Sequence, residues 1–560
     1  MVMQFPVASP MVEFVKEFVD RDLAWVVGLT YWYTYAVSYA AVIAAAGDVV
    51  AYWSLNDSSK VLVFLLFPLL VLAANNYRAK VFGNIEIVGG ILKIAIVLVL
   101  GIAMYVINSG AGLGHDIGTS YIKDGIQHRD EAAPSGGVAA LIAISLAVYP
   151  YIGVEAVTVT ALEARDPRQV KFAAKNIAWI TLLLYMFNII GFVLNVQWTN
   201  PYLPRYYDQW GGDNSEPVSL VGNEVQRRQS PTSPTLTHQM TKALPVIALE
   251  QTQKRHFADA INGFLLYSAL STANSALFVA SRICHGLAQG LQDDADSIVI
   301  KWLASLSHVG ADKIPRRAVF ASWILSWVPL LSLGSSFTAK SVQQVLFSAG
   351  STTCVLVWAS QSLAFLRYYY ALRDHSKELT GSRYSRYRRW ERMGAAKETC
   401  SHLGHWQPGL AWLSLLASVA IVLGFAGAGL VSDQHLVLKA LNIYLGPGTG
   451  LIIFIVLKCF RFARGEIGLA KINDWDSLRD TLDRLANSVR QRQPQSDDEG
   501  GEYEHELAHT IRHLGLSGGA PQYMTSMLGS TAHQSREEVV GVQSSDLMPP
   551  QTELHRAKDT

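Results

Sequence analysis

The sequence predicts an all-α polytopic membrane protein. Half of its 560 residues are hydrophobic and only 16% are charged, whereas soluble chains carry about 25% charged residues. Ten apolar runs approach or exceed the roughly 20 residues that a bilayer-spanning helix needs. They cover residues 24–50, 61–77, 85–107, 139–162, 176–197, 258–281, 318–334, 342–366, 409–432 and 439–460. A soluble protein would not hold ten such runs, so 24–460 is expected to form one transmembrane domain.

Charge and cysteine content exclude several other classes of function. The net charge of +1 provides no basic field for binding nucleic acid. The four cysteines, Cys284, Cys354, Cys400 and Cys459, form no CxxC pair. Neither a zinc ribbon nor a disulfide framework is therefore indicated, and no cofactor is expected.

Lysine and arginine set the expected orientation, because these residues collect in cytoplasmic loops. Segments 163–175, 282–317 and 367–408 carry four, five and nine of them. Three short loops on the opposite side, 51–60, 335–341 and 433–438, carry only Lys60 and Lys340. Both termini, 1–23 and 461–560, are thus predicted to lie in the cytoplasm, and 108–138 and 198–257 outside.

The polar segment 461–560 admits two interpretations. In "INDWDSLRDTLDRLANSVRQRQ", Trp475, Leu478, Leu482 and Leu485 stand at helical spacing and could form an amphipathic helix. The acidic "SDDEGGEYEHE" that follows is typical of a solvated chain. We expect a largely disordered tail that offers a place for cytoplasmic regulators to bind.

The fourth run contains residues that do not suit a straight membrane helix. Pro150, Gly153 and Glu155 stand in the middle of "SLAVYPYIGVEAVTVTALEARDPR". Irregular backbone at membrane depth survives only where it lines protein or a cavity, and transporters hold substrate at such breaks. The alternatives are a simple proline kink and a carboxyl group satisfied inside the bundle. The same alternative applies to Lys93 in the third run.

Small polar residues gather in two further runs. Run 258–281 contains "YSALSTANSALFVASR" and run 342–366 contains "SAGSTTCVLVW". Such residues line binding sites, but they also serve plain helix packing in membranes.

Several of these motifs together resemble the fungal amino-acid permeases of the amino acid–polyamine–organocation superfamily. "YIGVEAVTVTALEARDPR" is similar to the sixth-helix signature of that family, and "LSTANSALFVASRICHGLAQ" to the eighth. "GLTYWYTYAVSYAAVIAAAGDVVAYW", "GGILKIAIV" and "STTCVLVWASQSLAFLRYYYAL" resemble its third, fifth and tenth helices. The resemblance covers about residues 10 to 460 and is not specific to one substrate.

The resemblance implies a leucine-transporter-like inverted-repeat helix bundle, which has twelve helices in this family. It also implies import of amino acids, coupled to protons, across the plasma membrane, with the vacuolar or another internal membrane as the alternative. Lys93 and Glu155 are the residues implied for ion or proton coupling. The implied substrate-binding residues are Tyr39, Tyr149, Tyr151, Ile152, Gly153, Glu155, Ser271, Asn274, Ser275 and Ser351, with Val42 beside Tyr39 and Thr352 as an alternative to Ser351.

The sequence departs from the family pattern at two places. Val42 stands where many fungal members carry a glutamate, which weakens any assignment to cationic substrates. The segment that begins at Met1 resembles the part just after the second helix, so a chain without the first two helices is expected to transport poorly. The glycine string "GPGTGLI" at 446–452 resembles the missing first-helix motif only by coincidence. The length of 198–257 suggests an insertion.

Two alternatives from other classes remain. A chain that binds an amino acid without moving it would be a sensor or a pseudo-transporter. The tail also contains "HELAHTIRH", in which His505, Glu506 and His509 match the HExxH zincin motif, with His513 as a third candidate ligand. A zinc hydrolase needs a folded domain around that helix, so we expect no enzyme.

Overall fold

The computed structural model describes most of the chain up to residue 490. The residues not described are 3, 6, 8, 54–56, 78, 124, 126, 129–132, 160–166, 201, 204–241, 253–254, 292–297, 311–313, 334–338, 381–383, 385–386, 388–405, 429, 431–435, 466–467 and 491–560. Most of the 198–257 segment and the HExxH motif therefore lie outside the described residues.

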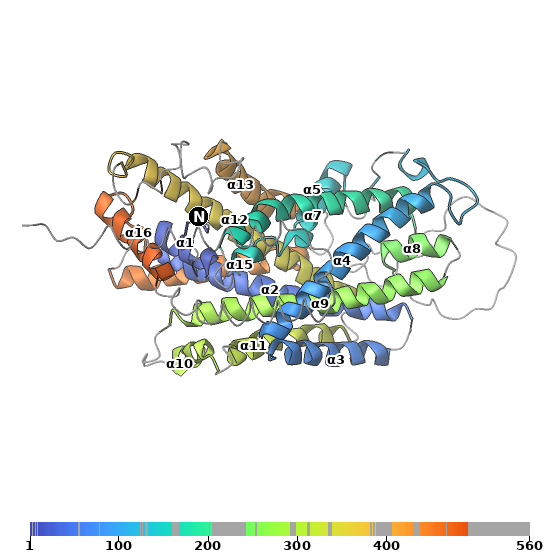
Figure 1. Ribbon diagram of the computed structural model, residues 1–560, viewed down its shortest axis with the longest axis horizontal. Helices are drawn as coiled ribbons and strands as arrows, with labels where there is room; N and C mark the ends of the chain where they lie inside the picture. The colour runs from blue at the N-terminus through green and yellow to red at the C-terminus, as the bar shows by residue number, and fades with distance from the viewer. Residues whose placement is uncertain are drawn as a thin grey trace, which may run out of the picture. The chain divides into compact units, whose positions relative to one another are not determined.

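All the secondary-structure elements in the described part of the chain are helices, which confirms the predicted all-α class (Figure 1). The α-helices are α1 (Pro10–Phe18), α2 (Arg21–Ala51), α3 (Asp57–Asn75), α4 (Ala79–Asn108), α5 (Gly136–Leu146), α6 (Ala156–Val159), α7 (Pro167–Asn195), α8 (Leu244–Gln251), α9 (Arg255–Ala288), α10 (Ile298–Ala304), α11 (Arg316–Trp323), α12 (Ala339–Asp374), α13 (Gly409–Val419), α14 (Ala426–Ala428), α15 (Leu436–Ala463) and α16 (Trp475–Arg490). Short 3₁₀ helices include η2 (Tyr149–Tyr151) and η5 (Ile324–Leu333), and η9 (Ala420–Phe425) is a π-helix.

Eight stretches of the described chain are long and apolar enough to cross a membrane. They coincide with eight of the ten predicted runs. The run at 61–77 appears as the shorter apolar helix Val61–Asn75, which carries Pro68 inside it. The run at 318–334 divides into α11 and the 3₁₀ helix η5, which contains Pro329. Proline removes a backbone donor and opposes continuous α-helix, so these two runs are the irregular ones.

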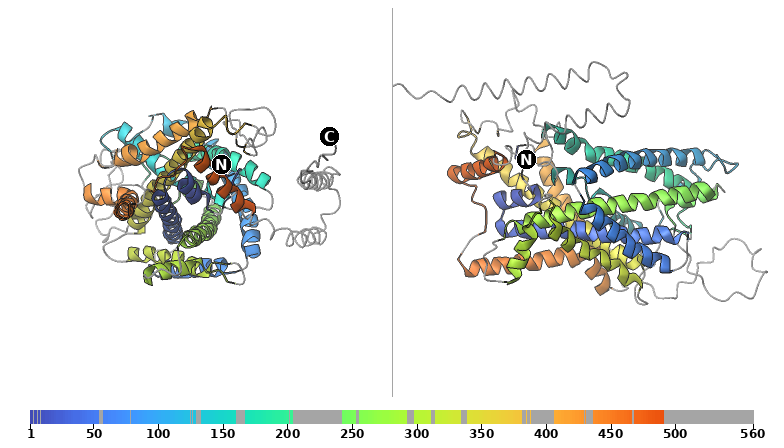
Figure 2. Two further views of the ribbon diagram at one scale, coloured as in Figure 1. Left: turned by 90° about the vertical axis from the view of Figure 1, so that its left-hand side faces the viewer. Right: turned by 60° about the horizontal axis from the view of Figure 1, so that its bottom comes forward.

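Helices α2 and α12 form the centre of the bundle. In their most apolar stretches 72% of α2 and 61% of α12 are buried, against 22% or less in α4, α7, α13 and α15. Helix α2 packs along both α9 and α12, and its ribbon lies inside the ring of other helices in Figure 2 (left). The outer helices instead expose apolar side chains such as Ile87, Leu413 and Ile455. These lie where lipid tails would contact the protein.

The glycine string in α15 serves close packing. A Cβ atom placed on Gly446 would lie 2.1 Å from Cγ2 of Thr353 on α12, and one on Gly450 would touch Val26 and Thr30 of α2. At Gly446 glycine therefore lets α15 approach α12 closely, whereas Gly450 only adjoins α2. These contacts support the interpretation that its likeness to a substrate-binding motif is coincidental.

Within the tail, Trp475–Arg490 adopt the amphipathic helix that the sequence left open as one of two interpretations. These residues form α16, and Leu478, Leu482 and Leu485 are at most 3% exposed. The amide of Ser477 bonds the Asp474 carboxylate at 3.1 Å. This backbone hydrogen bond lowers the pKa of Asp474 and caps the first turn. The helix is stable because its apolar face is buried against the rest of the protein. The polar composition of the tail does not show that such a contact exists.

Candidate functional site

The predicted break in the fourth run is present. Helix α5 ends at Leu146 and α6 begins only at Ala156. Between them Tyr149, Pro150 and Tyr151 form the 3₁₀ helix η2. Gly153 follows with a φ angle of +111°, a conformation that favours glycine. The break is more than a simple proline kink, because Ile152 is extended and Gly153 has a positive φ before α6 begins.

Backbone amides in the break are already hydrogen-bonded. The amides of Tyr151, Ile152, Val154 and Ala156 each bond the carbonyl three residues earlier, at 2.9–3.2 Å. The break is thus a series of tight turns in this conformation. Donors that a substrate carboxylate could accept from would have to be released first.

Glu155 is held firmly in the break. Its side chain is 8% exposed, its Oε1 accepts from the hydroxyl of Tyr35 at 2.8 Å, and its Oε2 accepts from the amide of Gly153 at 3.3 Å. The ring of Tyr35 stands edge-on to that of Tyr31, with centroids 5.2 Å apart. Both tyrosines belong to α2, so the central helix fixes the carboxyl group of the broken span. Tyr31 and Trp358 are further hydrogen-bonding neighbours of this carboxyl group. A buried carboxyl group surrounded by donors is pre-oriented to pair with a cationic group.

The aromatic residues of the break face two different neighbours. The Tyr149 ring lies 4.2 Å from that of Phe347 on α12, and its hydroxyl reaches the carbonyl of Ser38 on α2 at 3.5 Å. Tyr151 instead packs against Tyr185 of α7, 5.5 Å between centroids. Of the two predicted tyrosines, Tyr149 therefore points toward the bundle centre.

The remaining predicted residue of the break, Ile152, packs half-buried against the core. Tyr39 and Val42 are buried in α2, at 0% and 9% exposure. The hydroxyl of Tyr39 has Ser326 of η5 within hydrogen-bonding reach.

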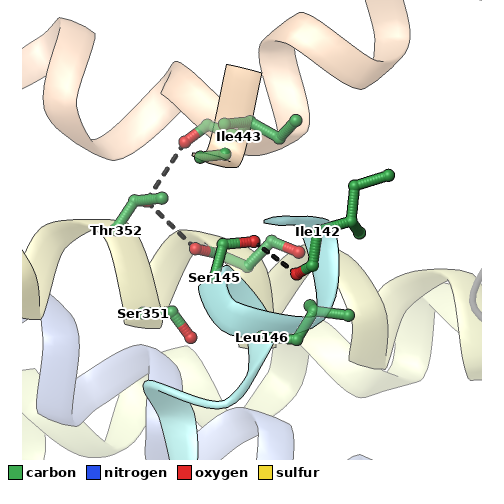
Figure 3. A pocket seen from close by; sticks show the side chains of 8 residues that line it. Ile142, Ser145, Leu146, Ser351, Thr352 and Ile443 are labelled. Atoms are coloured by element: carbon green, nitrogen blue, oxygen red, sulfur yellow. Dashed lines mark hydrogen bonds between the residues drawn. The ribbon is translucent and has the colours of Figure 1, made fainter. Parts of the chain in front are cut away.

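A small cavity lies between the end of α5 and helices α12, α14 and α15 (Figure 3). Its volume is about 10 Å³, which is about the minimum that a single water molecule needs. Ser348 Oγ has no partner in the described part of the chain, and Thr352 Oγ1 bonds the carbonyl of Ile443 at 3.1 Å. The lining residues are Ile142, Ser145, Leu146, Ser348, Ser351, Thr352, Ala426 and Ile443. The cavity brings the predicted Ser351 and Thr352 next to the broken span, but it is too small for an amino acid.

Ser271, Asn274 and Ser275 lie in a second group, on α9. Asn274 Nδ2 donates to Glu86 Oε1 of α4 at 3.1 Å, and its Oδ1 accepts from Asn75 of α3 at 2.9 Å. This network joins three helices. Ser275 Oγ bonds the carbonyl of Ser271 at 3.2 Å. Among the described residues no hydrogen bond or ion pair joins this group to the break, and α2 packs against both α9 and α12.

Lys93 lies on the same side of the bundle as the group of Ser271, Asn274 and Ser275. Glu86 stands seven residues before it on α4, which places both on one face of the helix. A Cβ atom on Gly89, one turn before Lys93, would lie 3.6 Å from Ser271 Oγ. No ion pair among the described residues joins Lys93 to Glu155.

Three residues were not predicted from the sequence but hold the predicted site residues in place: Tyr35, Asn75 and Glu86. Tyr35 bonds Glu155, and the other two bond Asn274. Glu86 had a usable signal, since it is a carboxylate near the start of an apolar run at heptad spacing from Lys93. Tyr35 had none, because α2 contains several tyrosines and only the packing selects one. In the part of the chain that the structure covers, no cluster of three His, Cys, Asp or Glu side chains could hold a metal.

Known proteins with similar sequences are permeases. The lysine-specific permease LysP of Escherichia coli is 25% identical over 66% of this chain and 67% of its own length. The tryptophan permease of Saccharomyces cerevisiae is 24% identical over 67% of this chain and 55% of its own length. A probable lysine/arginine permease, CAN2, of Candida albicans is 25% identical over 52% of this chain and 46% of its own length. The chain thus spans between about half and two thirds of the length of these relatives.

A sequence profile of the amino acid permease family matches residues 1–386. The match includes the break, both central helices and the α3–α4–α9 network. With this match and the eight apolar spans, the chain is a multi-pass integral membrane protein that belongs to the amino acid permease family, whose members are transporters rather than enzymes.

Proposed function

We propose that this protein imports amino acids by alternating access at the break between α5 and α6. The observation that carries the proposal is the buried Glu155, held at an interrupted membrane span by Tyr35 of the central helix α2. Breaks of this kind place backbone dipoles and an ionisable group at the midplane, where transporters bind substrate. The relatives are named for lysine, lysine/arginine and tryptophan, so the proposal names the amino-acid class and no single member.

The substrate would enter between the break and the two central helices. Tyr149, Ile152, Gly153 and Glu155 supply one wall, Tyr39 a second and Ser351 a third, whereas Tyr151 faces Tyr185 of α7. The adjoining cavity has room for about one water molecule, and the break amides are engaged in turns. Binding therefore requires α5, η2 and α6 to move away from α12, which is the kind of motion that alternating access supplies.

Ser271, Asn274, Ser275 and Lys93 would act from the other side of α2. We propose that Lys93 and Glu155 are the ionisable groups for proton coupling, each in its own group of helices. Both termini would face the cytoplasm, as the lysine and arginine content of the loops supports. The plasma membrane is the proposed location.

Uptake by the full chain in a permease-deficient cell tests the proposal. Labelled amino acids of each charge class would be supplied with and without a protonophore. We expect uptake of at least one class, at a low rate, and its loss when the protonophore is present. The Glu155→Gln variant should lose the proton dependence, whereas Glu13→Gln, which removes an exposed carboxylate on α1, should not.

Three results would contradict parts of the proposal. No uptake by correctly inserted protein would reject transport. Saturable binding of an amino acid without uptake would favour the sensor alternative. Unchanged proton dependence in Glu155→Gln would reject this residue as the coupling group.

A further inference from the structure

Helix α16 joins parts of the chain that are far apart in sequence. Its buried face, Leu478, Leu482 and Leu485, belongs to the same apolar core as Phe14 and Phe18 of α1. Leu379, Tyr384 and Tyr387, which follow α12, also belong to that core. Figure 1 shows α16 beside α1. Because this face is buried, α16 is packed into the bundle and is not merely attached to its surface.

Polar contacts bind α16 on both sides. Arg484 donates to Glu17 of α1 at 2.9 Å. Tyr384 donates to Asp483 at 2.7 Å. The ring of Trp475 lies 5.7 Å from that of Tyr384 and 6.0 Å from that of His375, just after α12. The helix therefore bridges α1 and the end of α12.

The chain leading into α16 closes the same end of the bundle. The carbonyl of Gly468 accepts from the amide of Arg21, and the amide of Ala470 donates to the carbonyl of Val19. The guanidinium of Arg367 on α12 donates to the carbonyls of both Val19 and Ala470, at 3.0 and 3.2 Å. One short segment is thus tied to the start of α2 and to α12 together.

Buried charges reinforce this junction. Asp22, 2% exposed, pairs with Arg461 at 2.8 Å and with Lys458 at 3.3 Å. Asp20, 4% exposed, pairs with Lys458 and caps the start of α2 through its carboxylate. Both cations stand on α15. Breaking one partner of a buried pair leaves an uncompensated charge, so the start of α2 is firmly held to α15.

We propose that α16 is a strap that holds α1 and the chain just after α12 together and must release before the site can open at this end. The inference rests on the proposed transport function. Helix α1 contacts α6, the second half of the broken span. An α1 that is tied through α16 to the end of α12 therefore restrains the segment that has to move away from α12 for binding. Ser351, near the site, and Asp374, at the tied end of α12, are separated by about 35 Å of continuous helix at 1.5 Å per residue.

A reversible cross-link tests the need for release. Glu17→Cys and Arg484→Cys together would be joined by a short bis-methanethiosulfonate, which a reductant removes. We expect uptake to be lost on cross-linking and restored on reduction. The matched control is Glu13→Cys with Lys16→Cys, whose native side chains meet at a similar 3.0 Å but both belong to α1. Each single cysteine variant controls for reaction with native thiols.

Unchanged uptake by fully cross-linked protein would overturn the strap. A loss of uptake in the α1 control as well would do the same, because the effect would not depend on α16.

A second measurement does not depend on transport. Leu482→Asp places a charge in the buried face, whereas Asp480→Ala changes an exposed residue of the same helix. Hydrogen exchange on the full chain should show faster exchange in α1 and at the end of α12 for Leu482→Asp only. Faster exchange confined to α16 would refute the strap. If the unmodified chain takes up no amino acid, the proposed function fails, and hydrogen exchange still decides whether α16 fastens the two ends.

Discussion

The hydrogen bond between Tyr35 and Glu155 gives the sharpest prediction. Tyr35→Phe removes only the hydroxyl that donates to Glu155 Oε1 at 2.8 Å. The ring keeps its edge-on contact with Tyr31. Tyr35 is 4% exposed and Glu155 8%, so water cannot easily replace the lost donor.

The expected magnitude follows from the type of bond. A hydrogen bond to a charged group contributes about 1.5–3 kcal/mol in proteins, although bonds between membrane helices average about 0.6 kcal/mol. The lower limit of the first range is used here, because Tyr31 and Trp358 also lie within hydrogen-bonding reach of the Glu155 carboxyl group and can partly replace the lost donor. At the lower limit, about 1.5 kcal/mol corresponds to about a tenfold change in an equilibrium or a rate.

Two assays measure this effect. Initial uptake rates in permease-deficient cells, at matched surface expression, should fall about tenfold in Tyr35→Phe. The melting temperature of the purified protein in detergent should fall as well. Tyr33→Phe is the control, since Tyr33 lies on the same helix and its hydroxyl makes no hydrogen bond to another described residue. Uptake and melting temperature equal to those of the unmodified chain would show that Tyr35 does not hold the carboxyl group.

Three further substitutions test the packing around the site. Gly446→Leu should abolish a monodisperse peak in detergent, because even a Cβ atom would lie 2.1 Å from Thr353 Cγ2, whereas Gly448→Ala, with no atom within 4 Å, should be tolerated. Gly153→Ala should destabilise the break by on the order of 1–3 kcal/mol, because alanine rarely adopts a φ of +111°; an unchanged melting temperature would contradict this. Asn274→Ala removes two interhelical hydrogen bonds and should cost about 1–2 kcal/mol, measured by thermal unfolding; an equally stable variant would show that the network does not stabilise the bundle.

The sequence predicted the fold class and most of the spans, because both depend on local composition. Runs of apolar residues report directly on burial in lipid. The break was also predictable, since Pro150, Gly153 and Glu155 each oppose a straight helix for a separate local reason. Where prolines interrupt a shorter run, as at Pro68 and Pro329, the boundaries were less accurate.

The division of the candidate residues into two groups was not predictable. Tyr149, Glu155 and Ser351 meet around the break, whereas Asn274 bonds Asn75 and Glu86 on the other side of α2. All of these residues are polar and stand in apolar runs, so periodicity alone cannot tell them apart. Only the position of α2 between α9 and α12 separates them.

By itself, the sequence determined that this is an all-α membrane protein with an interrupted span carrying Glu155. The tertiary structure decided which tyrosine holds that carboxyl group, and that α16 packs against α1 and the end of α12. The physical reason is the range of the interactions. Membrane insertion and helix breaking act within a few residues, whereas Tyr35 lies 120 residues from Glu155 and Arg484 lies 467 residues from Glu17. Contacts at such separations exist only once the bundle has assembled.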